Sequence, residues 1–180
     1  MGEIKSTLEL ALERTKGLIL SDEEKREVRQ KEMAKRATGL FRRYLENHLS
    51  LHDLWKEVDK FDEQTSRALK ETLLVQWIDA LSLSGENAQC LKGILSLKGI
   101  RAEETAQAVQ TLVSRFHEES EKEKSVLKME LTEALSRLKI HGSAVDPNVE
   151  ASPLWEKRRT DVETPYRARL EEMKARLKAS

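Results

Sequence analysis

The chain has 180 residues, of which 38% are hydrophobic and 36% are charged. This length fits one domain, or one domain with a tail, and the hydrophobic content is enough for a modest core. The 32 basic and 32 acidic side chains cancel, so net charge gives no argument for nucleic acid or a membrane surface. A single cysteine, Cys90, excludes an intramolecular disulfide and a multi-cysteine zinc site, and it favours a cytoplasmic location.

Proline is missing from residues 1–146, and the three prolines are Pro147, Pro153 and Pro165. Because proline interrupts helices, this distribution predicts long helices over most of the chain and a different structure near its end. Apolar residues recur at three- and four-residue steps within residues 3–16, which predicts an amphipathic helix that ends at Gly17.

Short polar signals predict where the next helices begin. Ser21-Asp-Glu-Glu24 fits a capping box that opens a helix of roughly 25 residues. A third helix is expected to begin near Ser50, and Asp62 can cap a fourth. The similar segments 81–85 and 95–99 each end in glycine, and both predict helix ends closed by a glycine in the left-handed conformation.

The longest predicted helix spans residues 102–140 and ends at Gly142. Its apolar residues form two blocks, which the wholly polar stretch 117–125 separates. In the second block, Leu131, Leu135 and Leu138 cover one heptad, which fits either a short coiled-coil seam or a plain core-facing stripe. We expect this helix to leave the core at the polar stretch and to make a second contact, for example with another copy of the chain.

Residues 141–164 show no helical period over their first half, so we expect an extended strap there. Thr164-Pro165 is a suitable helix start and predicts a basic amphipathic helix over 165–180. The predicted fold is therefore an all-α multi-helix bundle. Its parts are a helical core over 1–140 that contains the long helix, the strap 141–164, and the short helix 165–180.

No motif in the sequence predicts catalysis, since the usual phosphate-binding, dinucleotide-binding and hydrolase nucleophile motifs are missing. His48 and His52 lie one helical turn apart, but this spacing alone is a weak metal signal, and Cys90 is expected to pack in the core. No apolar run approaches the roughly 18 residues of a membrane span. We therefore expect a non-enzymatic protein with no cofactor, no metal and no membrane span.

Basic residues are concentrated in the second predicted helix. Residues 25–43 contain eight basic and two acidic side chains. Such a surface can attract a phosphate backbone, although a charged run is also typical of a solvated helix face. The residues that fall broadly on one side of this helix form the candidate nucleic-acid contact: Lys25, Arg29, Arg36 and Arg43.

The last apolar stripes form a candidate protein interface, made by Leu127, Leu131, Leu135, Leu138, Trp155, Tyr166, Leu170, Met173 and Leu177. Amphipathic helices commonly bind partners through such stripes. We therefore expect a helical scaffold or adaptor that self-associates, as a homo-oligomer, or binds another protein. The alternative is an RNA- or ribosome-associated factor that uses the basic helix 25–43, and its binding would collapse at high salt.

Two segments resemble an uncharacterised family of bacterial proteins of about this length: the opening GEIKSTLELALERTKGLILSDEE, and IHGSAVDPN at residues 140–148. The resemblance implies a bacterial cytosolic origin. It implies no activity, because that family brings none with it.

Overall fold

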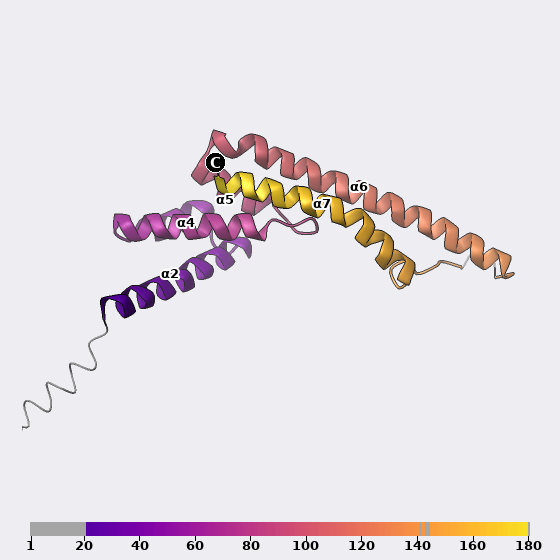
Figure 1. The fold of residues 1–180 in the computed structure, drawn as a ribbon, viewed down its shortest axis with the longest axis horizontal. Helices are drawn as coiled ribbons and strands as arrows, with labels where there is room; N and C mark the ends of the chain where they lie inside the picture. The colour runs from indigo at the N-terminus through magenta and orange to yellow at the C-terminus, as the bar shows by residue number, and fades with distance from the viewer. Residues whose placement is uncertain (1–20, 141, 143–144, 180) are drawn as a thin grey trace, which may run out of the picture. The chain divides into compact units, whose positions relative to one another are not determined.

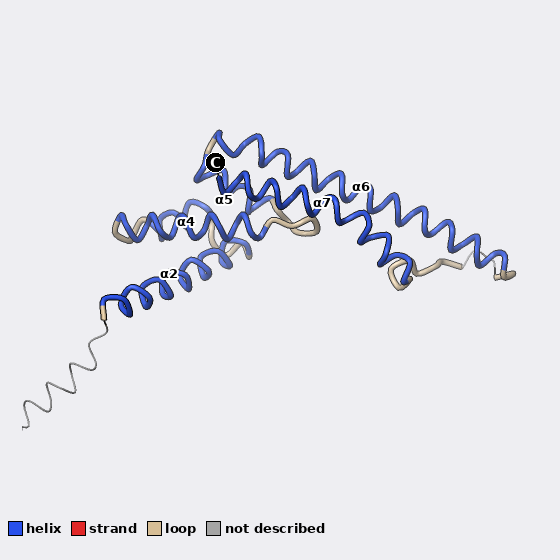
Figure 2. Tube along the Cα trace, in the orientation of Figure 1, coloured by secondary structure: helices blue, strands red, loops and turns tan. Residues whose placement is uncertain are grey.

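The computed structural model describes residues 21–140, 142 and 145–179 (Figure 1). This part of the chain is all-α, with six helices and no strand (Figure 2). The predicted helix over 3–16 lies outside the described residues. The chain divides into two compact units, Met1–Leu73 and Leu74–Ser180.

The first unit contains α2 (Asp22–Leu45), α3 (Leu51–Val58) and the first part of α4 (Glu63–Ala80). The predicted capping box at the start of α2 is confirmed. The Glu24 amide donates to Ser21 Oγ at 3.2 Å, and the Ser21 amide donates to Glu24 Oε2 at 2.7 Å. Each bond satisfies a backbone donor that the first turn of a helix would otherwise leave unpaired.

The predicted starts of α3 and α4 are also confirmed. The Asp53 amide donates to Ser50 Oγ at 3.1 Å, and the Thr65 amide donates to Asp62 Oδ1 at 3.1 Å. These caps fix where each helix begins, and each of the three helix segments buries an apolar face. The buried apolar side chains of the first unit are Ala37, Tyr44, Leu54, Val58, Leu69 and Leu73.

The second unit contains the end of α4, α5 (Ala88–Lys98), α6 (Ile100–Arg137) and α7 (Pro153–Ala179). Trp77 of α4 is fully buried and lies directly against α5. A Cβ atom added to Gly93 would lie 2.6 Å from the Trp77 ring. The absence of a side chain at Gly93 therefore allows the indole to reach the α5 backbone.

One of the two predicted glycine ends is confirmed and the other is wrong. Gly99 follows α5 with a φ of 59°, a conformation that glycine adopts without a steric cost. In contrast, α4 ends at Ala80, and Gly85 lies in the loop that follows it. The side chain of Asn87 holds this loop, because it accepts from the Ser82 amide at 3.0 Å and donates to the Ser82 carbonyl at 2.7 Å.

The predicted long helix is confirmed as α6, but it ends before Gly142. Lys139 takes the left-handed position with a φ of 62°, and the Ile140 amide donates to the Leu135 carbonyl at 3.0 Å. This bond satisfies a carbonyl that the end of the helix leaves open. The sequence favours Gly142 as the helix end because a lysine rarely takes the left-handed position that glycine usually fills.

The predicted strap over 141–164 is too long. Residues 145–152 are non-helical as expected, but α7 already begins at Pro153, so the second half of the strap and the separate short helix over 165–180 are wrong. Proline is favourable at the first position of a helix, so Pro153 can start α7 as readily as Pro165 could. Pro165 instead lies within α7, where it is exposed to solvent. Only residues 138–152 connect α6 to α7.

The two longest helices of the second unit pack against each other as an antiparallel pair (Figure 1). At one end, Trp155 of α7 packs with Leu127 of α6 and Val149 of the connection. Further along, Tyr166 of α7 packs with Phe116 of α6, with ring centroids 5.6 Å apart. Residue numbers therefore increase along α7 in the direction in which they decrease along α6, as expected for an antiparallel pair.

The contact between Gly93 and Trp77 gives a testable requirement. We expect Gly93→Ala to lower the free energy of unfolding by about 1–3 kcal/mol, because the new methyl group overlaps the buried indole. Gly39→Ala is the matched control. Nothing lies within 4 Å of a Cβ there, so the higher helix propensity of alanine should raise stability by up to about 1 kcal/mol. Urea denaturation measures both, and a Gly93→Ala variant at least as stable as the wild type would contradict the contact.

Candidate protein interfaces

The structure buries four of the nine side chains predicted for a protein interface, namely Leu127, Trp155, Leu170 and Leu177. They lie inside the second unit, so they are not exposed on its surface. An apolar stripe does not reveal whether its partner is the same chain or another one, and for these four residues the partner is the same chain. Of the others, Leu138 is exposed, and four are half-buried: Leu131, Leu135, Tyr166 and Met173.

The apolar stripe of α6 continues beyond the start of α7. Trp155, in the first turn of α7, packs at the level of Leu127, and the remaining ten residues of α6 run on for about 15 Å. Leu131 packs partly against the Leu127 cluster. Exposure then rises to 71% at Leu138 and is 49% at Ile140. We call Leu131, Leu135, Leu138 and Ile140 the α6 tip.

The polar stretch 117–125 remains helical within α6, and ion pairs hold it and the following turns to the rest of the unit. Lys124 Nζ lies 2.6 Å from Glu150, and Lys128 Nζ lies 2.7 Å from Asp146, both in the connection. In this structure the polar stretch therefore contacts its own chain. The expected contact with another copy is not needed to explain its composition.

Arg158 of α7 adds a further pair of contacts to α6. Its guanidinium lies 2.6 Å from Glu130 and 3.7 Å from Glu123. These pairs could not be predicted from the sequence. Their partners are 28 and 35 positions apart, so no local spacing rule could have found them.

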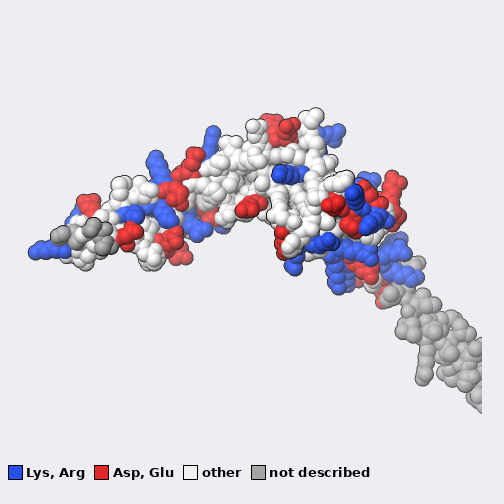
Figure 3. All heavy atoms as spheres, turned by 180° about the vertical axis from the view of Figure 1, so that it is seen from behind, with Lys and Arg blue, Asp and Glu red and all other residues white. Residues whose placement is uncertain are grey.

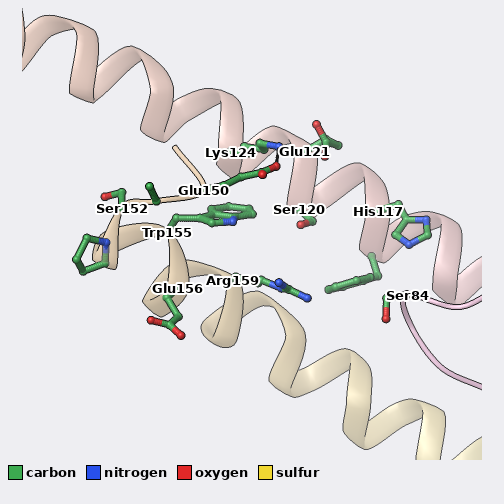
Figure 4. Close-up of a pocket in the computed structure, with 13 residues that line it drawn as sticks. Ser84, His117, Ser120, Glu121, Lys124, Glu150, Ser152, Trp155, Glu156 and Arg159 are labelled. Carbon is green, nitrogen blue, oxygen red and sulfur yellow. Dashed lines mark hydrogen bonds and ion pairs between the residues drawn. The ribbon is translucent and has the colours of Figure 1, made fainter. Parts of the chain in front are cut away.

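A groove of about 610 Å³ opens between α6 and α7 (Figure 4). The indole of Trp155 lies between the two helices, and the Arg159 side chain extends into the space beside it. Lys124 and Glu150 on its wall are already paired with each other, and Arg159 lies 3.9 Å from Glu163. Since its charges largely compensate one another, the groove offers no strong single charge to a ligand.

Tyr166 shows how a predicted interface residue is used within the chain. Its hydroxyl donates to Glu119 Oε2 at 2.5 Å, and this hydrogen bond raises the pKa of Tyr166. The bond and the ring contact with Phe116 join α7 to the middle of α6. Tyr166 therefore stabilises the helix pair.

The residues of the candidate nucleic-acid contact, Lys25, Arg29, Arg36 and Arg43, are exposed on α2, where blue side chains gather (Figure 3). We call these four residues the basic row. Arg36 lies over the Phe61 ring, 5.1 Å from its centroid, and is partly engaged by this cation–π contact. The guanidinium groups of Arg29 and Arg43 form no ion pair or hydrogen bond with any other residue that the structure describes. Their charges are therefore available to an anionic partner.

His48 and His52, whose spacing is a weak signal for a metal site, do not lie in the same helix. His48 lies after α2, with Nδ1 3.4 Å from Glu46, and His52 lies in α3, beyond the cap at Ser50. Within the described residues, no group of three or more histidine, cysteine, aspartate and glutamate side chains could hold a metal ion. None of the helices in that same part of the chain is long and apolar enough to cross a membrane.

The pair of Lys124 and Glu150 makes a prediction about pH. The hydrogen bond from Lys124 holds the pKa of Glu150 below its usual value, so the pair stabilises the fold above that usual value. The stabilisation is lost as pH falls through the lowered pKa. In Lys124→Ala, we expect an NMR titration to return the Glu150 pKa to its usual range. Lys128→Ala, which removes the partner of Asp146, should leave it lowered, and equal values in wild type and Lys124→Ala would rule out the pair.

Cys90 gives a second prediction. It is 3% exposed, and burial raises the pKa of its thiol, so the reactive thiolate is scarce near neutral pH. We expect iodoacetamide to label native Cys90 slowly and the urea-unfolded chain rapidly. A variant with Ser136→Cys, at an exposed position on α6, controls for reagent activity and should label at once in the folded protein. Rapid labelling of Cys90 in the native wild type would contradict its burial.

Comparisons with known proteins supply no relative from which a role could be transferred. No family model, no curated protein and no solved structure matches the chain. The contacts and charges of α2 and the α6 tip therefore carry the functional conclusion.

Proposed function

We propose that this protein is a non-enzymatic helical scaffold or adaptor that binds another protein, or a second copy of itself, through the α6 tip. The observation that carries the proposal is the continuation of the α6 apolar stripe past the first turn of α7. There it ends in the exposed side chains of Leu138 and Ile140. The buried half of the stripe already packs against a helix, and a partner helix could extend that packing outward.

Charges near the end of α6 are already paired within the chain, so apolar contact would supply most of the binding energy at the α6 tip. Glu130 lies 2.6 Å from Arg158, and Arg137 lies 2.7 Å from Glu133. Full burial of one exposed leucine or isoleucine is worth about 1.5–3 kcal/mol, so the α6 tip can contribute usefully to binding but needs support from further contacts. An apolar contribution of this size fits a partner that binds reversibly.

The experiment is affinity capture of the full chain at high salt from a lysate of the organism that makes it, followed by quantitative mass spectrometry. We expect Leu138→Glu to reduce the recovered partner, or the self-associated fraction in sedimentation velocity, by about tenfold. Because Leu138 is 71% exposed, this change should leave the fold intact. Leu131 is unsuitable for such a test, since it packs against the Leu127 cluster.

Met129→Glu is the matched control, because Met129 is 66% exposed and lies on the opposite side of α6 from Leu131. It should leave both readouts at the wild-type level. Identical partner lists and sedimentation profiles for wild type and Leu138→Glu would count against the α6 tip.

An RNA- or ribosome-associated role through α2 is the alternative. Its support is the set of exposed cations without partners in the described chain, including Arg29 and Arg43. Charge alone would attract any polyanion, so it does not select RNA over an acidic protein. Nuclease treatment in the same capture separates the two, since components held by RNA would leave with it.

A further inference from the structure

A groove lies beside the basic row, between the first half of α2 and the first half of α4. Both segments belong to the unit Met1–Leu73. The groove has a volume of about 360 Å³. We call it the α2 groove; besides two glutamines, it is lined by Arg26, Arg29, Met33, Thr65 and Ala68.

The charge of the α2 groove has a single sign. Arg26 and Arg29 are both exposed, and the guanidinium group of neither forms an ion pair or hydrogen bond with another described residue. No acidic side chain is among the residues that line the groove. A ligand there would therefore meet two guanidinium groups that the described chain leaves uncompensated, in contrast to the mixed charges between α6 and α7.

The floor of the α2 groove is apolar in part. Met33 and Ala68 are half-buried, so each keeps some apolar surface exposed to solvent. A methionine thioether adapts to irregular partner side chains. A phosphate backbone has no group that would fill such a floor, and no aromatic side chain lines the groove for base stacking. The combination favours a protein segment over RNA.

We propose that the α2 groove binds an acidic amphipathic helix of a partner protein. Apolar side chains of that helix pack on Met33 and Ala68, and its carboxylates pair with Arg26 and Arg29. Arginine and carboxylate groups can form two parallel hydrogen bonds, which fixes the position of the partner as well as its charge. Arg26 and Met33 are separated by about 10 Å along α2, which matches two turns of a docked helix.

This inference rests on the proposed adaptor function, since it names the chemistry of a partner. It uses residues of the other unit, so it and the α6 tip can fail separately. A variant with Leu138→Glu should bind through the α2 groove as the wild type does. Loss of peptide binding in that variant would show that the two surfaces are not independent and would overturn the assignment to the α2 groove.

The test is fluorescence anisotropy of the full chain with a labelled synthetic helix that carries leucines on one face and glutamates beside them. We expect the double variant Arg26→Glu, Arg29→Glu to weaken binding by at least about tenfold. The matched control is Lys31→Glu, Lys35→Glu, which removes the same charge from the opposite side of α2 and should change affinity by less than about threefold. Circular dichroism verifies that both variants keep their helices.

A second peptide, with serine in place of each leucine, separates groove binding from general attraction. We expect it to lose most of the affinity, as should Met33→Asp in the protein. Equal binding of both peptides would overturn the proposal, because attraction to any anion would then suffice. It would also be overturned if the leucine peptide failed to bind. Tighter binding of a single-stranded RNA oligonucleotide at physiological salt, lost in Arg26→Glu, Arg29→Glu, would instead assign the surface to nucleic acid.

Discussion

The second unit depends on the packing of α7 against α6. Along α7, Trp155 packs on Leu127 of α6 and Tyr166 packs on Phe116 of α6. Leu170 and Leu177, further along α7, are buried as well. A single helix of 38 residues would otherwise expose its apolar stripe along its length. Since α7 is shorter than α6, the pairing covers only part of that stripe. The exposed α6 tip is thus a direct result of the difference in length between the two helices.

Electrostatic contacts take over where the apolar stripe of α6 is interrupted. Lys124, Lys128 and Glu130 each meet an opposite charge from the connection or from α7. Exposed pairs of this kind contribute little stability individually, but they set the register of one segment against another. They explain why a wholly polar stretch can remain in a helix that packs against its own chain. The α2 groove shows the opposite situation, since its arginines lack such partners in the described chain.

Features set by local chemistry could be predicted from the sequence, and features set by distant contacts could not. The caps at Ser21, Ser50 and Asp62 each depend on residues three positions away, and the structure confirms all three. The predicted start of the last helix was wrong because Pro153 and Pro165 are equally suitable as the first residue of a helix. The packing of Trp155 on Leu127, which sequence spacing does not reveal, accompanies the earlier start. The α2 groove could not be predicted for the same reason, because its two sides come from segments roughly 30 to 40 positions apart.

The position of Pro165 gives α6 and α7 different mechanical characters. Proline has no amide hydrogen, so the hydrogen-bond ladder of α7 is interrupted within the helix, while α6 contains no proline over its 38 residues. On either side of Pro165, α7 has its own attachment: Trp155 before it, and Leu170 and Leu177 after it. We therefore expect α7 to bend most easily near Pro165. The two halves of α7 then behave as shorter helical segments that pack against the uninterrupted helix α6.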